Sequence, residues 1–195
     1  MFDARTITAL VLVAFGGAVA ASSLSPATFQ HGASQESDTE DAFQRPAPEH
    51  VEMLKAVGEW EGLLTWSFPG MPSGESRATE TIRALGPYHT VASFQSQFGG
   101  APYEGLGVMS FDPATGELMN TWSDSMTPAT LLMRGTLDVE SRVGRLSWVA
   151  RGPDGALVPH RNVTTHGKDA YESIFYMGEG ADEVEVMTIS MKRVK

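Results

Sequence analysis

The sequence predicts an all-β fold: a closed antiparallel up-and-down β-barrel of eight to ten strands, preceded by one short helix. After residue 58, short runs of β-type alternation recur at intervals of roughly 8–12 residues, and clusters rich in Gly and Pro such as 112–116 separate them. These connections are too short for parallel crossovers, which need about a dozen residues or more. A sheet of this many strands tends to close on itself, because closure removes its exposed edges.

Composition excludes several classes of function. The chain has 195 residues, which suits one domain, and it has 0 Cys. The lack of cysteine excludes disulfides, thiolate metal sites, a thiol nucleophile and a lipid-modified cysteine anchor. The net charge of −10 argues against binding to nucleic acid or to an anionic membrane surface.

The N-terminal residues have the pattern of a secretory signal. Arg5 precedes an apolar run over 7–19, and small residues stand before a cut after Ala20 or Ala21. The run is shorter than the roughly 20 apolar residues that a spanning helix needs. We therefore expect residues 1–21 to be a cleaved signal peptide, with export to the periplasm or the extracellular space and no membrane span in the mature protein.

The next segment, 22–45, is rich in Ser, Gln, Asp and Glu and has few large apolar groups. Such a stretch buries too little apolar surface to offset the entropy of ordering, so we expect a disordered leader. The barrel domain is then expected over 46–195.

The first element of this domain is a short helix. Val51, Leu54 and Val57 recur at a spacing of three within 49–58, and a terminal glycine can end the helix in a left-handed cap. Ten strand candidates follow: 59–68, 75–85, 89–98, 103–111, 117–126, 130–139, 143–151, 157–166, 170–177 and 183–193.

Alternation along these strands separates an apolar face from a polar one. Trp60, Leu64 and Trp66 share one face of the first strand, and Met187 and Met191 share one face of the last. A wall with one apolar side is what a barrel with an interior requires.

The strand at 117–126 carries the most informative residues. Asn120, Trp122, Asp124 and Met126 point to one face if the strand is regular. With the tryptophan inside the barrel, the amide and the carboxylate would be inside as well. A cavity with apolar walls and a few polar groups is the usual composition of a small-molecule site.

Two interpretations of Asp124 are open. A buried carboxylate is costly unless it is paired or hydrogen-bonded, so Asp124 either recognises a ligand or moves a proton, or it has a structural partner. Candidate partners are Arg134, Arg161 or a turn amide. The predicted ligand-binding residues are Trp66, Asn120, Trp122, Asp124, Met126 and Arg134.

No metal, cofactor or catalytic set is assigned. His160 and His166 would lie roughly 20 Å apart on one strand face, too far to share a metal ion. Ser125 with Asp124 and His160 supplies the residue types of a triad, but the Gly-x-Ser-x-Gly elbow is absent.

The stretch 57–62, Val-Gly-Glu-Trp-Glu-Gly, resembles the Gly-x-Trp opening of lipocalins and the wider calycin group. The resemblance implies that Trp60 packs at the closed end of the barrel. It also implies that a basic residue near the end of the last strand, here Arg193, lies against that tryptophan.

Further motifs resemble the bacterial domain of unknown function family 1579 over nearly all of 46–195. They are Glu49-His50, the 57–62 stretch, Phe98-Gly99-Gly100, Tyr103-Glu104-Gly105, 111–116, 122–126 and 187–193. The resemblance implies a lipocalin-like barrel and no particular reaction.

These observations favour an exported protein that holds a small, largely apolar or amphipathic molecule inside the barrel. Two alternatives stay open. One is a barrel enzyme that uses Asp124 as general acid or base. The other is a packed barrel without a cavity that serves as an interaction module.

Overall fold

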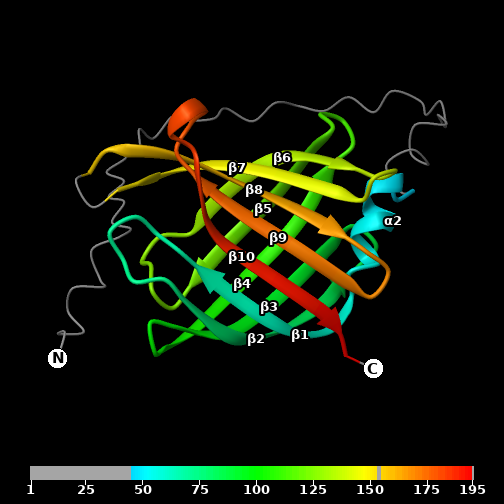
Figure 1. The fold of residues 1–195 in the computed structure, drawn as a ribbon. Helices are drawn as coiled ribbons and strands as arrows, with labels where there is room; N and C mark the ends of the chain where they lie inside the picture. The colour runs from blue at the N-terminus through cyan, green and yellow to red at the C-terminus, as the bar shows by residue number, and fades with distance from the viewer. Residues whose placement is uncertain (1–44, 153–154, 195) are drawn as a thin grey trace, which may run out of the picture. The chain divides into compact units, whose positions relative to one another are not determined.

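The computed structural model describes residues 45–152 and 155–194, which form one closed barrel (Figure 1). The signal peptide expected over 1–21 and nearly all of the leader expected over 22–45 lie outside the described residues. The elements are α2 (Pro48–Leu54), β1 (Gly58–Trp66), β2 (Gly74–Leu85), β3 (His89–Phe98), β4 (Ala101–Asp112), β5 (Glu117–Asp124), β6 (Leu131–Asp138), β7 (Val143–Arg151), β8 (Leu157–His166), β9 (Ala170–Met177), the 3-10 helix η2 (Gly180–Asp182) and β10 (Val184–Arg193).

Every strand pairs antiparallel with its neighbour in sequence, and β1 pairs with β10 to close the barrel. The closing register places Trp60 opposite Arg193 and Trp66 opposite Met187. The predicted fold class is therefore confirmed, including the short helix. All ten predicted strands are present, with ends shifted by at most a few residues.

The inward face of the wall follows the period-two pattern. In β1, Trp60, Leu64 and Trp66 are buried, whereas Leu63 between them is 45% exposed. Buried inward residues form two clusters. One gathers around β1 and β2: Trp60, Leu64, Trp66, Ala78, Phe94, Tyr171 and Met191. The other lies beside α2: Met53, Phe111, Leu118, Met133 and Leu146.

Helix α2 covers one end of the barrel (Figure 1) and is shorter than the predicted 49–58. It ends at Leu54 because the carbonyl groups that follow bond to side chains of the wall. The indole of Trp60 donates to the carbonyl of Ala56 at 2.9 Å. The guanidinium of Arg193 donates to the carbonyls of Val57 and Lys55, both at 2.7 Å. The chain therefore turns into β1 instead of continuing the helix.

In the part of the chain that the structure describes, no helix has the length and apolar character needed to cross a membrane.

Candidate functional site

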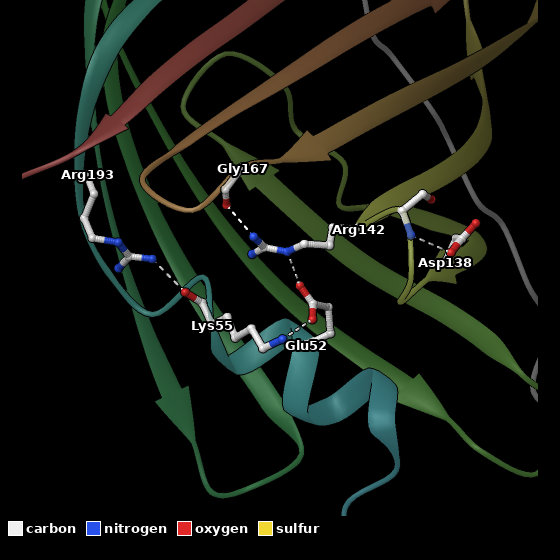
Figure 2. A network of polar contacts seen from close by, with 7 residues as sticks. Glu52, Lys55, Asp138, Arg142, Gly167 and Arg193 are labelled. Carbon is white, nitrogen blue, oxygen red and sulfur yellow. Dashed lines mark hydrogen bonds and ion pairs between the residues drawn. The ribbon is translucent and has the colours of Figure 1, made fainter.

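Side chains of α2 and of two turns fasten the covered end of the barrel (Figure 2). The carboxylate of Glu52 accepts from the Lys55 ammonium and from Nε of Arg142, both at 2.6 Å. Arg142 also donates to the carbonyl of Gly167 at 2.7 Å, so one guanidinium joins α2, the β6–β7 turn and the β8–β9 turn. Burial acts to raise the pKa of Glu52, but hydrogen bonds from Lys55 and Arg142 outweigh it and hold the pKa below its usual value.

Arg142 reaches this position with a backbone φ of +57°, the left-handed region that non-glycine residues rarely adopt. The surrounding ion pair compensates for the strain of this conformation. His50 adds a further link: its Nδ1 accepts from the amide of Ala47, so its Nε2–H donates to the carbonyl of Phe111, each at 3.0 Å. The covered end is therefore held by polar contacts on several sides.

Trp60 and Arg193 lie at this same end. The guanidinium carbon of Arg193 stands 4.2 Å from the centre of the Trp60 ring, which is cation–π geometry. The resemblance to calycins implies this pairing, and here it closes the junction between β1 and β10.

The half of the barrel away from α2 has inward aromatic side chains that stay half-buried, although Trp122 and Trp148 among them also pack against the cluster beside α2. Trp148 on β7 stacks on His160 of β8, with ring centres 5.4 Å apart and planes 18° apart. Phe175 on β9 meets the same indole edge-on at 6.4 Å. Met177 and Met187 are also half-buried on inward positions. Solvent therefore reaches apolar wall at this end.

Trp122 of β5 contributes a second half-buried indole, and glycines of β4 make room for it. A Cβ placed on Gly105 would stand 2.1 Å from Cζ2 of Trp122, so only glycine allows the indole to lie there. The indole N–H donates to the hydroxyl of Tyr103 at 3.1 Å. Burial raises the pKa of Tyr103, and the nearby carboxylate of Asp124 raises it further, so this hydroxyl is neutral at physiological pH.

Asp124 stands at the end of β5 and organises the turn that follows. Its Oδ1 accepts from the amides of Met126 and Thr127, both at 2.8 Å. Of the structural partners considered for this carboxylate, the structure has the turn amide and neither arginine. The same bonds end the strand at Asp124, so Met126 lies in the following loop. The prediction of a strand over 117–126, which placed Met126 on the strand, is wrong at this end. Asn120 is half-buried on the inward face, with its amide nitrogen 3.9 Å from Sδ of Met133.

Two other predicted site residues lie apart from this group. Trp66 is buried, packs on Phe98 at 4.7 Å and donates its indole N–H to the carbonyl of Pro72, so it fastens the β1–β2 loop. Arg134 points to the outer face and pairs with Glu117. Its neighbour Met133 faces inward, and alternation sends the next side chain outward, so Arg134 does not share a face with the inward residues predicted to bind a ligand.

A shallow depression of about 370 Å³ lies on the outer face of β3, β4 and β5. Six of its eight lining residues have polar side chains: Ser93, Gln95, Glu104, Ser123, Asp124 and Ser125. The depression lies on the outer face, and it is bordered by Gly105, which packs against the Trp122 indole on the inner face.

Sequence reasoning missed the inward polar groups Glu80, Tyr103 and Tyr171, and it weighed His160 only as a metal ligand or triad member. The signal for Glu80 was present, because it lies between the apolar residues Ala78 and Ile82 on the same face of the strand. Burial lowers the pKa of both His160 and His166, so both imidazoles are neutral near pH 7. Within the described ranges, no three His, Asp or Glu side chains lie close enough together to hold a metal ion.

Fold and site together define an up-and-down β-barrel with one fastened end and one end lined by half-buried aromatic side chains. The chain belongs to the DUF1579 family, described as a protein of unknown function, whose family model matches residues 45–193. No curated protein matches it.

Two solved structures are similar to this chain. A crystal structure of Rv2717c from M. tuberculosis has 15% sequence identity and a TM-score of 0.57, and the match covers 77% of this chain and 100% of that one. A de novo designed fluorescence-activating β-barrel has 16% identity and a TM-score of 0.39, with coverage of 73% and 96%. The first likeness supports the barrel fold, and the second is too distant to support anything further.

Proposed function

We propose that this protein binds a small, largely apolar molecule at the aromatic-lined end of the barrel. The observation that carries the proposal is the group of half-buried inward side chains formed by Trp122, Trp148, His160 and Phe175. Apolar surface left in water forgoes about 25 cal/mol per Å², so covering the exposed part of these rings is favourable. Binding a ligand recovers that free energy.

Polar groups beside the aromatic wall would orient such a ligand. Tyr103 keeps its hydroxyl next to Trp122, and Asn120 lies on the same inward face. Nδ1 of His160 contacts the carbonyl of Val158 at 2.8 Å and is its donor in the neutral ring. Nε2 is then an acceptor, available to a hydroxyl or N–H of the ligand.

Native mass spectrometry of the purified protein, together with thermal shifts across a panel of lipids and isoprenoids, tests the proposal. We expect co-purified small-molecule mass or a raised melting temperature with at least one ligand class. Trp148→Ala should abolish the shift. Val149→Ala, one residue along on the outer face, is the matched control and should keep it. An empty barrel with no shift across the panel would overturn the proposal.

We also propose that the chain is exported and that its signal is removed after Ala20 or Ala21. The support is the charge, apolar run and small residues of the N-terminal sequence. N-terminal sequencing of the protein from fractionated cells tests this. A full-length chain retained in the cytoplasm would contradict it.

A further inference from the structure

One carboxylate lies on the inward face away from both ends of β2. Glu80 stands opposite Trp60 in the β1–β2 register and opposite Phe94 in the β2–β3 register. Both of these aromatic neighbours are buried at 2% exposure, and Glu80 itself is half-buried. A carboxylate in such surroundings is costly unless a partner compensates for its lost hydration.

Among the residues that the structure describes, Glu80 has one hydrogen-bond partner, and that partner is neutral. The hydroxyl of Tyr171, from β9, donates to Oε2 of Glu80 at 2.5 Å. Among the described residues, no Lys, Arg or His forms an ion pair with this carboxylate, in contrast with Glu52, which has two cationic partners. Arg193 is engaged by Trp60 and by the carbonyls of Val57 and Lys55.

The second oxygen of Glu80 is not fully enclosed. Every fully enclosed side-chain nitrogen or oxygen in the described residues has a hydrogen-bond partner. Oε1 of Glu80 has no partner, so it is not fully enclosed. It is therefore an acceptor on the inward wall that keeps some surface accessible to water.

Aromatic rings surround this acceptor. The rings of Trp60 and Tyr171 meet edge-to-face with centres 5.1 Å apart, and Phe94 leads on to Trp122 with centres 6.4 Å apart. Aromatic faces attract cations, and Arg193 already uses Trp60 in this way. The net charge of −10 adds a long-range preference for positively charged ligands.

We propose that Glu80 binds the protonated amine of an amphipathic ligand, whose apolar part lies toward Trp122 and Trp148. This inference rests on the proposed function and names the chemistry of the ligand's polar group. Oε1 accepts an N–H of the ammonium, while Tyr171 holds Oε2 and fixes the carboxylate.

The protonation of Glu80 is consistent with this assignment. Burial raises the pKa of the empty site, although the bond from Tyr171 acts in the opposite direction. An ammonium beside the carboxylate favours its charged form and lowers that pKa. Amine binding therefore releases protons in solutions acidic enough for the empty site to be partly protonated.

Three ligands that share one tail separate the contribution of the polar group from that of the apolar part. Dodecylamine, dodecanol and dodecanoate are titrated below their aggregation concentrations by isothermal calorimetry and by intrinsic tryptophan fluorescence. We expect wild-type protein to bind the amine most tightly and the carboxylate most weakly. Glu80→Gln should weaken amine binding by roughly 10- to 100-fold, as expected for a hydrogen bond to a charged group, and leave dodecanol unchanged.

Glu75→Gln is the matched control, because it makes the same change on the exposed face of the same strand. It should bind all three ligands like wild type. Circular dichroism shows that each variant is folded. Equal affinity for the amine and the alcohol, or an amine affinity that Glu80→Gln leaves unchanged, would overturn this inference while the proposed function holds. Tighter binding of dodecanoate would overturn it too, since a protonated Glu80 would then be the donor. Failure of all three ligands to bind would count against the proposed function itself.

Discussion

Strand β7 runs from the end of the barrel that α2 covers toward the opposite end, and the burial of its inward side chains differs along its length. Leu146 faces inward beside α2 and is 5% exposed, packed in the cluster with Met53 and Leu118. Trp148, two residues along on the same face, is half-buried and stacks on His160. One strand thus supplies a filled core and a partly wet wall. The filled core and the proposed binding wall therefore depend on different inward residues of the same strand.

The largest expected loss of stability is at Leu146, and it is compared with the loss at Trp148. Leu146→Ala should lower the free energy of unfolding by about 3 kcal/mol, since it leaves a cavity in a well-packed core. Trp148→Ala removes a larger side chain but should cost less than half as much, because the indole is already partly hydrated. Urea denaturation of both variants measures this. A loss at Trp148 equal to that at Leu146 would show that the two ends are not separable.

The next largest loss of stability is expected when the ion pair between Arg142 and Glu52 at the covered end is removed. Arg142→Ala should cost about 2–3 kcal/mol, because Glu52 stays buried with only Lys55 as partner. Arg134→Ala, which removes an exposed pair on the outer wall, should cost less than about 1 kcal/mol. Chemical denaturation at neutral pH compares them. Similar losses for both variants would mean that Arg142 contributes no more than a surface pair.

The same pair has a pH dependence with a defined sign. The pKa of Glu52 is lower in the folded protein than the usual 4.5, so its contribution to stability is present above that pH and is lost as the pH falls through the folded value. Wild-type protein should therefore lose stability in acid more steeply than Arg142→Ala. Parallel acid-denaturation curves would contradict this.

A smaller loss of stability is expected at Gly105, whose missing side chain leaves room for the Trp122 indole. Gly105→Ala should cost about 1 kcal/mol and red-shift the tryptophan emission, because the new methyl group displaces the Trp122 indole. Gly144→Ala near α2 is the control: its Cβ would meet only Cδ2 of Leu118, at 3.7 Å. An unchanged emission spectrum for Gly105→Ala would contradict the assigned position of the indole.

The smallest effect concerns the two histidines of β8. Burial lowers the pKa of both, so their contribution to stability is present above pH 6.5 and is lost as the pH falls toward the folded values. In NMR titrations with a bound apolar ligand, the pKa of His160 should fall further while that of His166 stays unchanged. A ligand that changes only the pKa of His166 would show that it binds at the covered end.

The sequence predicted the architecture well because the barrel is local in sequence. Turn clusters such as 112–116 mark each hairpin, and alternation assigns Trp60 and Leu64 to the inside. The site was harder to predict. Arg134 was predicted as a ligand-binding residue and as a candidate partner of Asp124, although its register after Met133 places it on the outer face. The ends of strands were also hard to predict. Strand β5 ends at Asp124, before Met126, because the side chain of Asp124 accepts a hydrogen bond from the Met126 amide.

Other features depend on contacts between distant segments. The bond between Glu80 and Tyr171 joins residues 91 positions apart, and the ion pair between Glu52 and Arg142 joins residues 90 apart. No local pattern encodes which partner such a residue finds. The left-handed backbone of Arg142 is likewise explained only by the partners that it reaches.

The pairing of β1 with β10 has a consequence for synthesis of the chain. Each of the other strand pairings in the described barrel joins two strands that are consecutive in sequence, so it can form as soon as the second strand emerges from the ribosome. The pairing of β1 with β10 instead needs the first and the last strand of the domain. Until Arg193 has been made, β1 and β9 each present an unsatisfied edge, and Trp60 lacks its cationic cover. A nascent chain is therefore prevented from completing its barrel until translation of the domain is nearly finished.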